Sequence, residues 1–265
     1  PNISTHPDIK MISFTGSTIA GIDIQEKAAK TVKRVSLELG GKSAHIVCEG
    51  VDLNAVIPNA INQCFINSGQ SCSAPTRLLI PEVSINNIKN IIVDHIKTLI
   101  FNDPNDVNTT HGPVVNQKQY NTIQEFIKSG IDEGYEIVTG GLGNPDNCNN
   151  GYFIRPTVFI NVDNSATIAQ EEIFGPVLSI ISYSSIDNAI DIANNSKYGL
   201  SNYITCLDYD DGYNIAKRIH SGQSIINKIG RGSVPAPFGG FKLSGNGREH
   251  GKYGLEEYLE IKAII

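Results

Sequence analysis

Cys72 is the residue whose type and setting best fit a nucleophile. It lies in a polar, glycine-containing segment, residues 67–74, between a predicted helix and a predicted strand. Most free cysteines are buried packing residues, whereas a thiol in an exposed polar loop is accessible enough to react. No His lies near Cys72 in the sequence, so the pattern does not favour a Cys–His protease. The segment indicates a reactive thiol, and a buried structural thiol is the alternative.

Glu38 is the second candidate for chemistry. It ends an apolar strand just before two glycines, in the segment Leu-Glu-Leu-Gly-Gly-Lys at residues 37–42. Glycines allow a ligand or a neighbouring backbone to approach closely. A carboxyl group among apolar residues tends to have a raised pKa, which suits a general base. The alternative is an edge-strand Glu that faces water, as most charged side chains do.

Three further turns have the composition of ligand-binding segments. Residues 14–18, followed by Gly21, join a predicted strand to a predicted helix, where backbone N–H groups can bind a phosphate; such turns are also plain connections. Residues 171–177 carry two acids before a turn, which fits either hydrogen bonding to sugar hydroxyls or a helix end. Residues 237–249 are rich in glycine and contain Phe238, which indicates a tight backbone wrap with an aromatic wall, or else a flexible loop.

Composition excludes several classes of function. The 265 residues include 21 Lys and Arg against 27 Asp and Glu, without a basic block, which disfavours nucleic acid and anionic membranes as partners. The apolar runs are too short to span a bilayer, and the first residues do not read as a secretory signal. Five widely spaced Cys without a CxxC pair predict free thiols in the cytosol or an organelle matrix, and no zinc site.

The elements that must position these residues alternate between β-rich runs and helical periodicity, which indicates an α/β fold. Strands are expected at residues 10–15, 34–39, 44–48, 76–80, 176–183, 202–206 and 224–226. Helices are expected at residues 21–31, 52–65, 84–99, 116–130, 185–194 and 208–220. Residues 140–151 are expected to form a surface loop.

Taken together and in order, these segments resemble the motifs of the aldehyde dehydrogenase superfamily. The motifs are Phe-Thr-Gly-Ser-Thr, Leu-Glu-Leu-Gly-Gly-Lys, Gly-Gln-x-Cys, Glu-Glu-Ile-Phe-Gly-Pro and Pro-Phe-Gly-Gly-x-Lys-x-Ser-Gly. The interval of 34 positions between Glu38 and Cys72 also agrees with the family. The resemblance runs from about Met11 to the C-terminus.

The resemblance implies a dehydrogenase that uses NAD or NADP. Cys72 would attack an aldehyde to form a thiohemiacetal, which loses hydride to the nicotinamide and becomes a thioester. Glu38 would activate the water that hydrolyses this thioester. The backbone N–H of Cys72 would form half of an oxyanion hole. No metal is implied.

The resemblance also implies contacts for the cofactor and the substrate. The implied cofactor residues are Gly16, Ser17 and Gly21 near the pyrophosphate, Leu39, Glu172 at the nicotinamide-side ribose, and Phe174 beside the ring. The implied substrate-side residues are Phe238, an aromatic of the substrate tunnel, and Asn227, a structural polar residue at the floor of the site.

The motifs start midway through the family pattern, so we expect about half of a family member. Residues 1–39 would be a remnant of the Rossmann-like cofactor domain, and residues 40–244 a catalytic domain with an open, mostly parallel sheet. Residues 245–265 would form a C-terminal segment whose strand at 258–264 pairs with a neighbouring subunit of a homo-oligomer.

The upstream half of the family pattern holds the second oxyanion donor, and such a donor is worth about 100–1000-fold in rate. We therefore expect weak dehydrogenase activity from this chain alone. Two alternatives remain open: a non-catalytic homologue that acts as an assembly partner, and a thiol esterase that needs no cofactor. The aldehyde, and the choice between NAD and NADP, are set by upstream residues.

Overall fold

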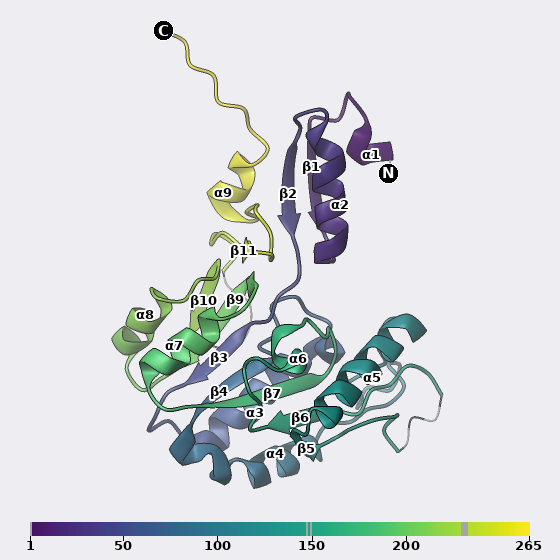
Figure 1. The fold of residues 1–265 in the computed structure, drawn as a ribbon, viewed down its shortest axis with the longest axis vertical. Coiled ribbons are helices and arrows are strands. Elements are labelled where there is room, and N and C mark those ends of the chain that lie inside the picture. Colours follow the sequence, from purple (N-terminus) through teal and green to yellow (C-terminus); the bar gives the residue numbers. More distant parts are fainter. Residues whose placement is uncertain (1, 147, 149, 229–232) are drawn as a thin grey trace.

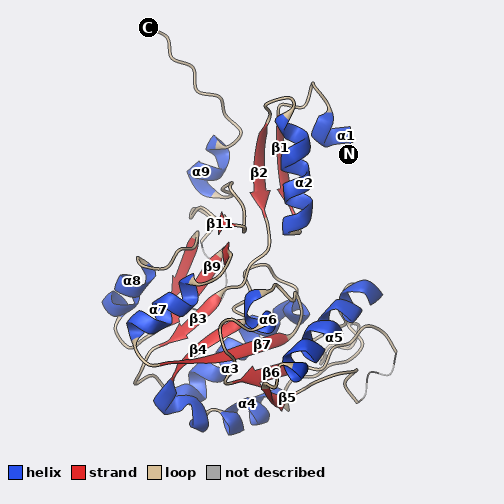
Figure 2. Ribbon diagram, in the orientation of Figure 1, coloured by secondary structure: helices blue, strands red, loops and turns tan. Residues whose placement is uncertain are grey.

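The computed structural model describes residues 2–146, 148, 150–228 and 233–265. Its largest element is a seven-stranded sheet with the order β10-β9-β3-β4-β7-β6-β5. In chain order the strands are β3 (Ala44–Val47), β4 (Arg77–Pro81), β5 (Glu136–Thr139), β6 (Thr157–Ile160), β7 (Val177–Tyr183), β9 (Ser201–Thr205) and β10 (Gln223–Ile226). Neighbours run parallel except for β5 and β6. The predicted open, mostly parallel α/β sheet is confirmed (Figure 2).

Helices cover both faces of this sheet. They are α3 (Leu53–Phe65), α4 (Lys89–Ile96), α5 (Gln117–Asp132), α6 (Thr167–Gln170), α7 (Ile186–Asn194) and α8 (Tyr209–Ala216). Leu78 and Ile80 of β4 pack with α3 and α4, while Leu79 between them packs with α7 and α8. A third cluster joins α5 and α6 to β6 and β7. Burial on both faces explains why these strands are nearly continuous apolar runs.

A smaller unit stands above one edge of the large sheet (Figure 1). It contains α1 (Asn2–Thr5), the parallel strands β1 (Met11–Thr15) and β2 (Arg34–Glu38), and α2 (Thr18–Ala29). Residues 39–43 lead from β2 directly into β3. The C-terminal ends of β1 and β2 therefore face the upper edge of the large sheet, and Glu38 is the last residue of its strand.

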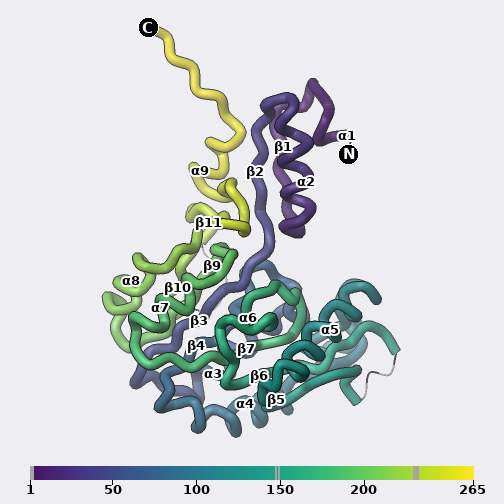
Figure 3. Tube along the Cα trace, in the orientation of Figure 1, coloured from purple at the N-terminus to yellow at the C-terminus, as the bar shows by residue number. Residues whose placement is uncertain are grey.

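The end of the chain returns to the outer edge of β2. Strand β8 (Tyr198–Gly199) pairs antiparallel with β11 (Phe241–Lys242), and α9 (Gly251–Glu256) follows β11. Between β11 and α9, the backbone N–H of Leu39 donates to the carbonyl of Ser244 at 3.0 Å, and that of Asn246 donates to Leu37 at 3.2 Å. Figure 3 shows this C-terminal segment beside the strand that carries Glu38.

Several element boundaries differ from the sequence-based expectations. Helix α2 begins at Thr18 instead of Gly21, because the side chain of Ser17 accepts a hydrogen bond from the backbone N–H of Ala20 at 3.3 Å and caps the helix. Helix α5 continues past Gly130. The missing side chain there lets the helix approach Phe159, whose ring lies 2.8 Å from the place a Cβ would occupy.

The helix expected at residues 84–99 is two elements. A 3-10 helix, η2 (Glu82–Asn87), precedes α4 (Lys89–Ile96). The break follows two consecutive Asn residues, which are weak helix formers. Strands β5 and β6 were not anticipated. Both are four residues long and flank the glycine-rich loop, so neither carries a long pattern.

Residues 258–264 have no strand assignment in the single chain. Leu259 and Glu260 still contact Arg34 of β2, and the end of the chain extends away from the body of the molecule (Figure 1). The strand predicted there needs a neighbouring subunit as its partner, so it stays a prediction. Within the described residues, no helix combines the length and apolarity needed to cross a bilayer.

Candidate active site

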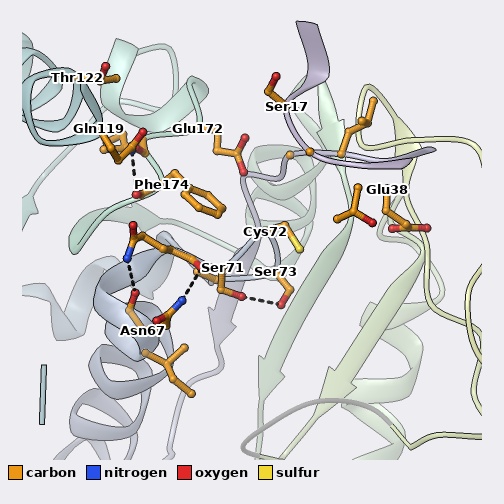
Figure 4. A pocket seen from close by; sticks show the side chains of 18 of the residues that line it. Ser17, Glu38, Asn67, Ser71, Cys72, Ser73, Gln119, Thr122, Glu172 and Phe174 are labelled. Carbon is orange, nitrogen blue, oxygen red and sulfur yellow. Dashed lines mark hydrogen bonds between the residues drawn. The ribbon is translucent and has the colours of Figure 1, made fainter. Parts of the chain in front are cut away.

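A cavity of about 940 Å³ opens where the β1–α2 turn meets the loops that follow α3 and α6. Among the residues predicted for the site, those that line it are Gly16, Ser17, Glu38, Leu39, Cys72, Glu172 and Phe174 (Figure 4). Glu38 and Cys72 come from separate segments and are brought to one cavity. This is the placement that a shared reaction centre requires.

Cys72 lies in a tight turn at residues 71–74. The backbone N–H of Ala74 donates to the carbonyl of Ser71 at 3.1 Å, which places Cys72 and Ser73 at the two central positions. Gly41 packs against this turn so closely that a Cβ there would lie 2.4 Å from the carbonyl oxygen of Cys72. The turn is therefore fixed against the segment that follows Glu38.

The residues just before this turn have a left-handed backbone. Asn67, Ser68 and Gly69 have φ values of 52°, 55° and 73°. For residues other than Gly this conformation costs of the order of 1 kcal/mol and is held by surrounding structure. Here the Ser68 hydroxyl donates to the carbonyl of Gly112 at 2.7 Å. The Gln70 side-chain oxygen accepts from the backbone N–H of Val115 at 2.9 Å.

The thiol of Cys72 is half-buried, which disfavours its ionised form. Burial raises its pKa, and the negative charges of Glu172 and Glu38 raise it further. Hydrogen bonds from the backbone N–H groups of Cys72 and Ser73 act in the opposite direction. The groups that act on this thiol in the described residues include no cation.

Glu38 is buried, with 4% of its surface exposed. Burial and the charge of Glu249 raise its pKa to about 8, partly offset by Arg248. Within the described part of the chain, neither carboxyl oxygen has a hydrogen-bond partner. A carboxyl group with this pKa can take up and release a proton near neutral pH, which general base catalysis needs.

Glu172 approaches from the opposite side of the cavity. Its carboxylate accepts a hydrogen bond from the backbone N–H of Gly41 at 3.1 Å. Burial raises its pKa, while that hydrogen bond and the charge of Lys42 lower it. A Cβ on Gly40 would lie 2.0 Å from a carboxylate oxygen of Glu172, so the glycine pair of the motif makes room for this side chain.

Helix α5 supplies polar residues that were missed in the sequence analysis. Gln119 and Thr122 line the cavity, and the Gln119 side-chain amide donates to the carbonyls of Ile173 and Phe174, each at 3.0 Å. Phe174 itself has a φ of 55°. In the sequence, Asn116 is the cap residue that indicates where this helix starts. The helix face that turns toward the cavity depends on packing and has no local signal.

Three predicted site residues do not line this cavity. Gly21 lies in α2, where a Cβ would fall 2.6 Å from the side chain of Leu39, so this glycine permits helix–strand packing. Asn227 accepts a hydrogen bond from the backbone N–H of Cys206 at 2.9 Å. Phe238 pairs with Glu249 through the backbone, and its ring lies 6.1 Å from that of His250.

The lining residues fit the nicotinamide side of a dinucleotide. The N-terminus of the twelve-residue helix α2 presents backbone N–H groups, Glu172 is a carboxylate suited to ribose hydroxyls, and Phe174 is an aromatic wall. Gly16 has no side chain to fill the turn. Among the described residues, no group of three or more His, Cys, Asp and Glu side chains is arranged to hold a metal ion.

Similarity to known proteins identifies the family. The aldehyde dehydrogenase family model matches residues 1–264. A Staphylococcus haemolyticus protein whose name assigns it to the aldehyde dehydrogenases is 47% identical over 262 residues, which cover 99% of this chain and 55% of that protein. The chain therefore spans about half the length of the relatives it matches.

Solved structures similar to this chain are also aldehyde dehydrogenases, and the chain again covers about half of each. Aldehyde dehydrogenase C from Pseudomonas syringae, a variant in complex with NAD+ and octanal, matches with a TM-score of 0.97 and 44% identity, over 99% of this chain and 54% of that chain. An aldehyde dehydrogenase from Mycobacterium tuberculosis, complexed with NAD+, matches with a TM-score of 0.92 and 43% identity, over 96% and 52% of the two chains.

Proposed function

Because the chain belongs to the aldehyde dehydrogenase family, we propose that its cavity carries out the thiol chemistry by which an aldehyde is oxidised to a carboxylic acid. The observation that carries this proposal is the convergence of Cys72, Glu38 and Glu172 on one cavity. A nucleophile, a base near neutral pKa and a carboxylate for ribose hydroxyls are the groups that this reaction uses.

Cys72 acts as the nucleophile. Its thiolate attacks the carbonyl carbon, and the carbonyl oxygen becomes an oxyanion that accepts a hydrogen bond from the backbone N–H of Cys72. When bound, NAD or NADP supplies the acceptor for the hydride that this carbon loses. The acyl group then remains on the sulfur of Cys72 as a thioester.

Glu38 acts as the general base for hydrolysis. In its ionised form it takes a proton from a water molecule, whose oxygen attacks the thioester carbon and releases the acid and the Cys72 thiolate. Its burial excludes bulk water from the carboxyl group and limits competing proton exchange.

Five residues that line the cavity, Leu39 among them, are assigned to hold the cofactor. Gly16 and Ser17 at the start of α2 face the pyrophosphate, Glu172 binds the nicotinamide-side ribose, and Phe174 packs beside the ring. The NAD+ found in both relatives supports NAD as the cofactor. The octanal of one relative, with the apolar side chains of Ile66 and Ala74 in this cavity, supports an apolar aldehyde as the substrate.

Hydrolysis of p-nitrophenyl acetate tests the thiol chemistry without a cofactor. We expect turnover that is lost in Cys72→Ser and kept in Cys48→Ser, the matched control at a thiol outside the cavity. Equal turnover by Cys72→Ser and the parent would contradict the nucleophile assignment. NAD-dependent oxidation of octanal, measured beside it, separates the dehydrogenase from a plain thiol esterase. A chain inert in both assays would favour the assembly-partner alternative.

Assembly and location complete the proposal. The C-terminal segment pairs with a neighbouring copy, in keeping with the exposure of Leu259 and Ile261. All five Cys are free, which suits a reducing compartment such as the cytosol.

A further inference from the structure

We propose that Tyr203 is a positioning residue for the nucleophile: its phenolic hydroxyl holds the turn at residues 71–74 in the conformation that makes Cys72 reactive. The proposal rests on the role assigned to Cys72. Tyr203 is not part of any motif identified in the sequence, and it does not come from the loops that carry the other site residues. It lies on strand β9, within the large sheet.

The contact is direct. The hydroxyl of Tyr203 donates a hydrogen bond to the backbone carbonyl of Ser73 at 3.1 Å. The side chain is buried, with 7% of the residue exposed, and it contributes to the wall of the cavity beside Cys72 and Ser73. The donor on strand β9 therefore reaches the residue that directly follows the nucleophile.

The strand holds Tyr203 rigidly. In the parallel pairing of β3 and β9, Tyr203 lies in register with His45, and the two rings are 6.0 Å apart. His45 is in turn bonded through Nε2 to the hydroxyl of Thr205 at 2.8 Å. Burial lowers the pKa of His45 to about 4, so this ring stays neutral at physiological pH. Tyr203 is thus fixed by the sheet and not by a loop.

Three contacts restrain the turn, and the Tyr203 hydroxyl makes the third. Inside the turn, Ala74 N–H donates to Ser71 at 3.1 Å. On one side Gly41 packs against the carbonyl of Cys72. On the remaining side Tyr203 binds the carbonyl of Ser73. This last bond fixes the peptide plane after Ser73 and so limits rotation at that residue.

The orientation of this turn matters because the thiolate depends on it. The groups that favour the ionised sulfur are the backbone N–H groups of Cys72 and Ser73, and burial and two acids oppose them. Without a nearby cation among those groups, reactivity follows the alignment of two amides. Loss of the Tyr203 hydroxyl frees the Ser73–Ala74 peptide, whose N–H closes the turn on Ser71, and so loosens the backbone that carries both N–H groups.

Alkylation of Cys72 by iodoacetamide tests this, followed as a function of pH with the modified peptide identified by mass spectrometry. Tyr203→Phe keeps the ring and removes the hydroxyl. We expect alkylation at neutral pH to slow by about 2–10-fold, the effect of one net hydrogen bond, and the midpoint of the pH profile to move upward. Tyr213→Phe is the matched control, because Tyr213 is 52% exposed on α8 and does not line the cavity.

A rate and midpoint unchanged in Tyr203→Phe would overturn the proposal, even if Tyr203→Leu slows the reaction, because the ring alone would then be responsible. Thermal unfolding of each variant separates a local effect from loss of the fold. If iodoacetamide does not modify Cys72 in the parent protein, the assigned nucleophile is wrong. If it modifies Cys72 equally in the parent and in Tyr203→Phe, only the positioning role fails.

Discussion

The carboxyl group of Glu38 is protonated at neutral pH, since burial and the charge of Glu249 raise its pKa to about 8. Only the ionised form can accept a proton from water, so hydrolysis of an acyl group on Cys72 should accelerate as the pH rises through about 8. Glu38→Gln should remove this dependence and leave slow deacylation. The deacylation phase of p-nitrophenyl acetate turnover, measured from pH 6 to about 9 around that pKa, checks both expectations.

A matched control for this pH profile is Glu26→Gln, since Glu26 is exposed on α2 and lies outside the cavity. It should retain the rise with pH. A parent profile that is flat across this range would remove Glu38 from the role of base.

The same carboxyl group should make the protein less stable as the pH rises toward about 8. Its pKa is about 8 in the folded chain against 4.5 as the ordinary value, so the folded state holds a proton that the unfolded state has released between these pH values. The free energy of unfolding therefore falls as the pH rises from about 4.5 to about 8. Urea unfolding of Glu38→Gln should lack this part of the fall. If the free energies of unfolding of the parent and of Glu38→Gln fall equally with pH, Glu38 is not buried in the way described.

The residues with a chemical signature of their own were predictable, and those defined by packing were not. Cys72 in its polar loop and Glu38 before two glycines each stand out along the chain, and both line the cavity. Gln119 and Tyr203 have no such signature. Gln119 acts through the carbonyls of another loop, and Tyr203 acts from a neighbouring strand. Both roles depend on contacts between segments distant in sequence.

At the scale of elements, the joint between β4 and α7 depends on Arg77. This residue is 2% exposed, and its guanidinium donates to the carbonyls of Lys42, Ile192 and Ala193 at 3.0, 2.9 and 2.9 Å. Two of these carbonyls end helix α7, where a cation is also favoured by the helix dipole. Arg77 thereby ties the sheet to the helix that covers it.

Arg77→Met should lower the free energy of unfolding by about 3 kcal/mol or more, because it leaves several buried acceptors without donors. Urea denaturation measures this loss. Arg218→Met serves as the control: Arg218 is about half exposed and pairs with Asp187 at the surface, so its loss should cost under about 1 kcal/mol. Similar unfolding curves for the two variants would show that the buried donors contribute little.

The alternation of strands and helices was predictable because the apolar runs of a doubly covered sheet differ from amphipathic helices. The residues at which elements begin and end were less predictable. The Ser17 cap moves the start of α2 by three residues, and a contact with Phe159 lets α5 pass through Gly130. At both positions, a single contact outweighs the preference that the residue type generally has for helix or for breaking a helix.

At the scale of the whole molecule, the C-terminal segment leaves a row of apolar side chains uncovered. Leu255, Tyr258, Leu259 and Ile261 are 63%, 62%, 52% and 100% exposed. Large apolar side chains exposed together on one segment mark an interface. We expect the chain to self-associate, and removal of residues 258–265 to shift its mass, measured by light scattering at matched concentrations, toward the monomer.

The control for this deletion is Val107→Asp. Val107 is 96% exposed in the loop between α4 and α5, away from the C-terminal segment, so its replacement should leave the mass unchanged. Equal masses for the parent and the shortened chain would contradict assembly through this segment.

The pairing of residues 244–246 with the edge of β2 has a consequence for the timing of synthesis. The strand that carries Glu38 gains this border only when residues near the C-terminus have been made. A nascent chain still attached to the ribosome can already fold its thiol loop against the central strands. Its base, however, lacks this border until translation is nearly finished, so the part of the centre that releases an acyl group from Cys72 is completed last.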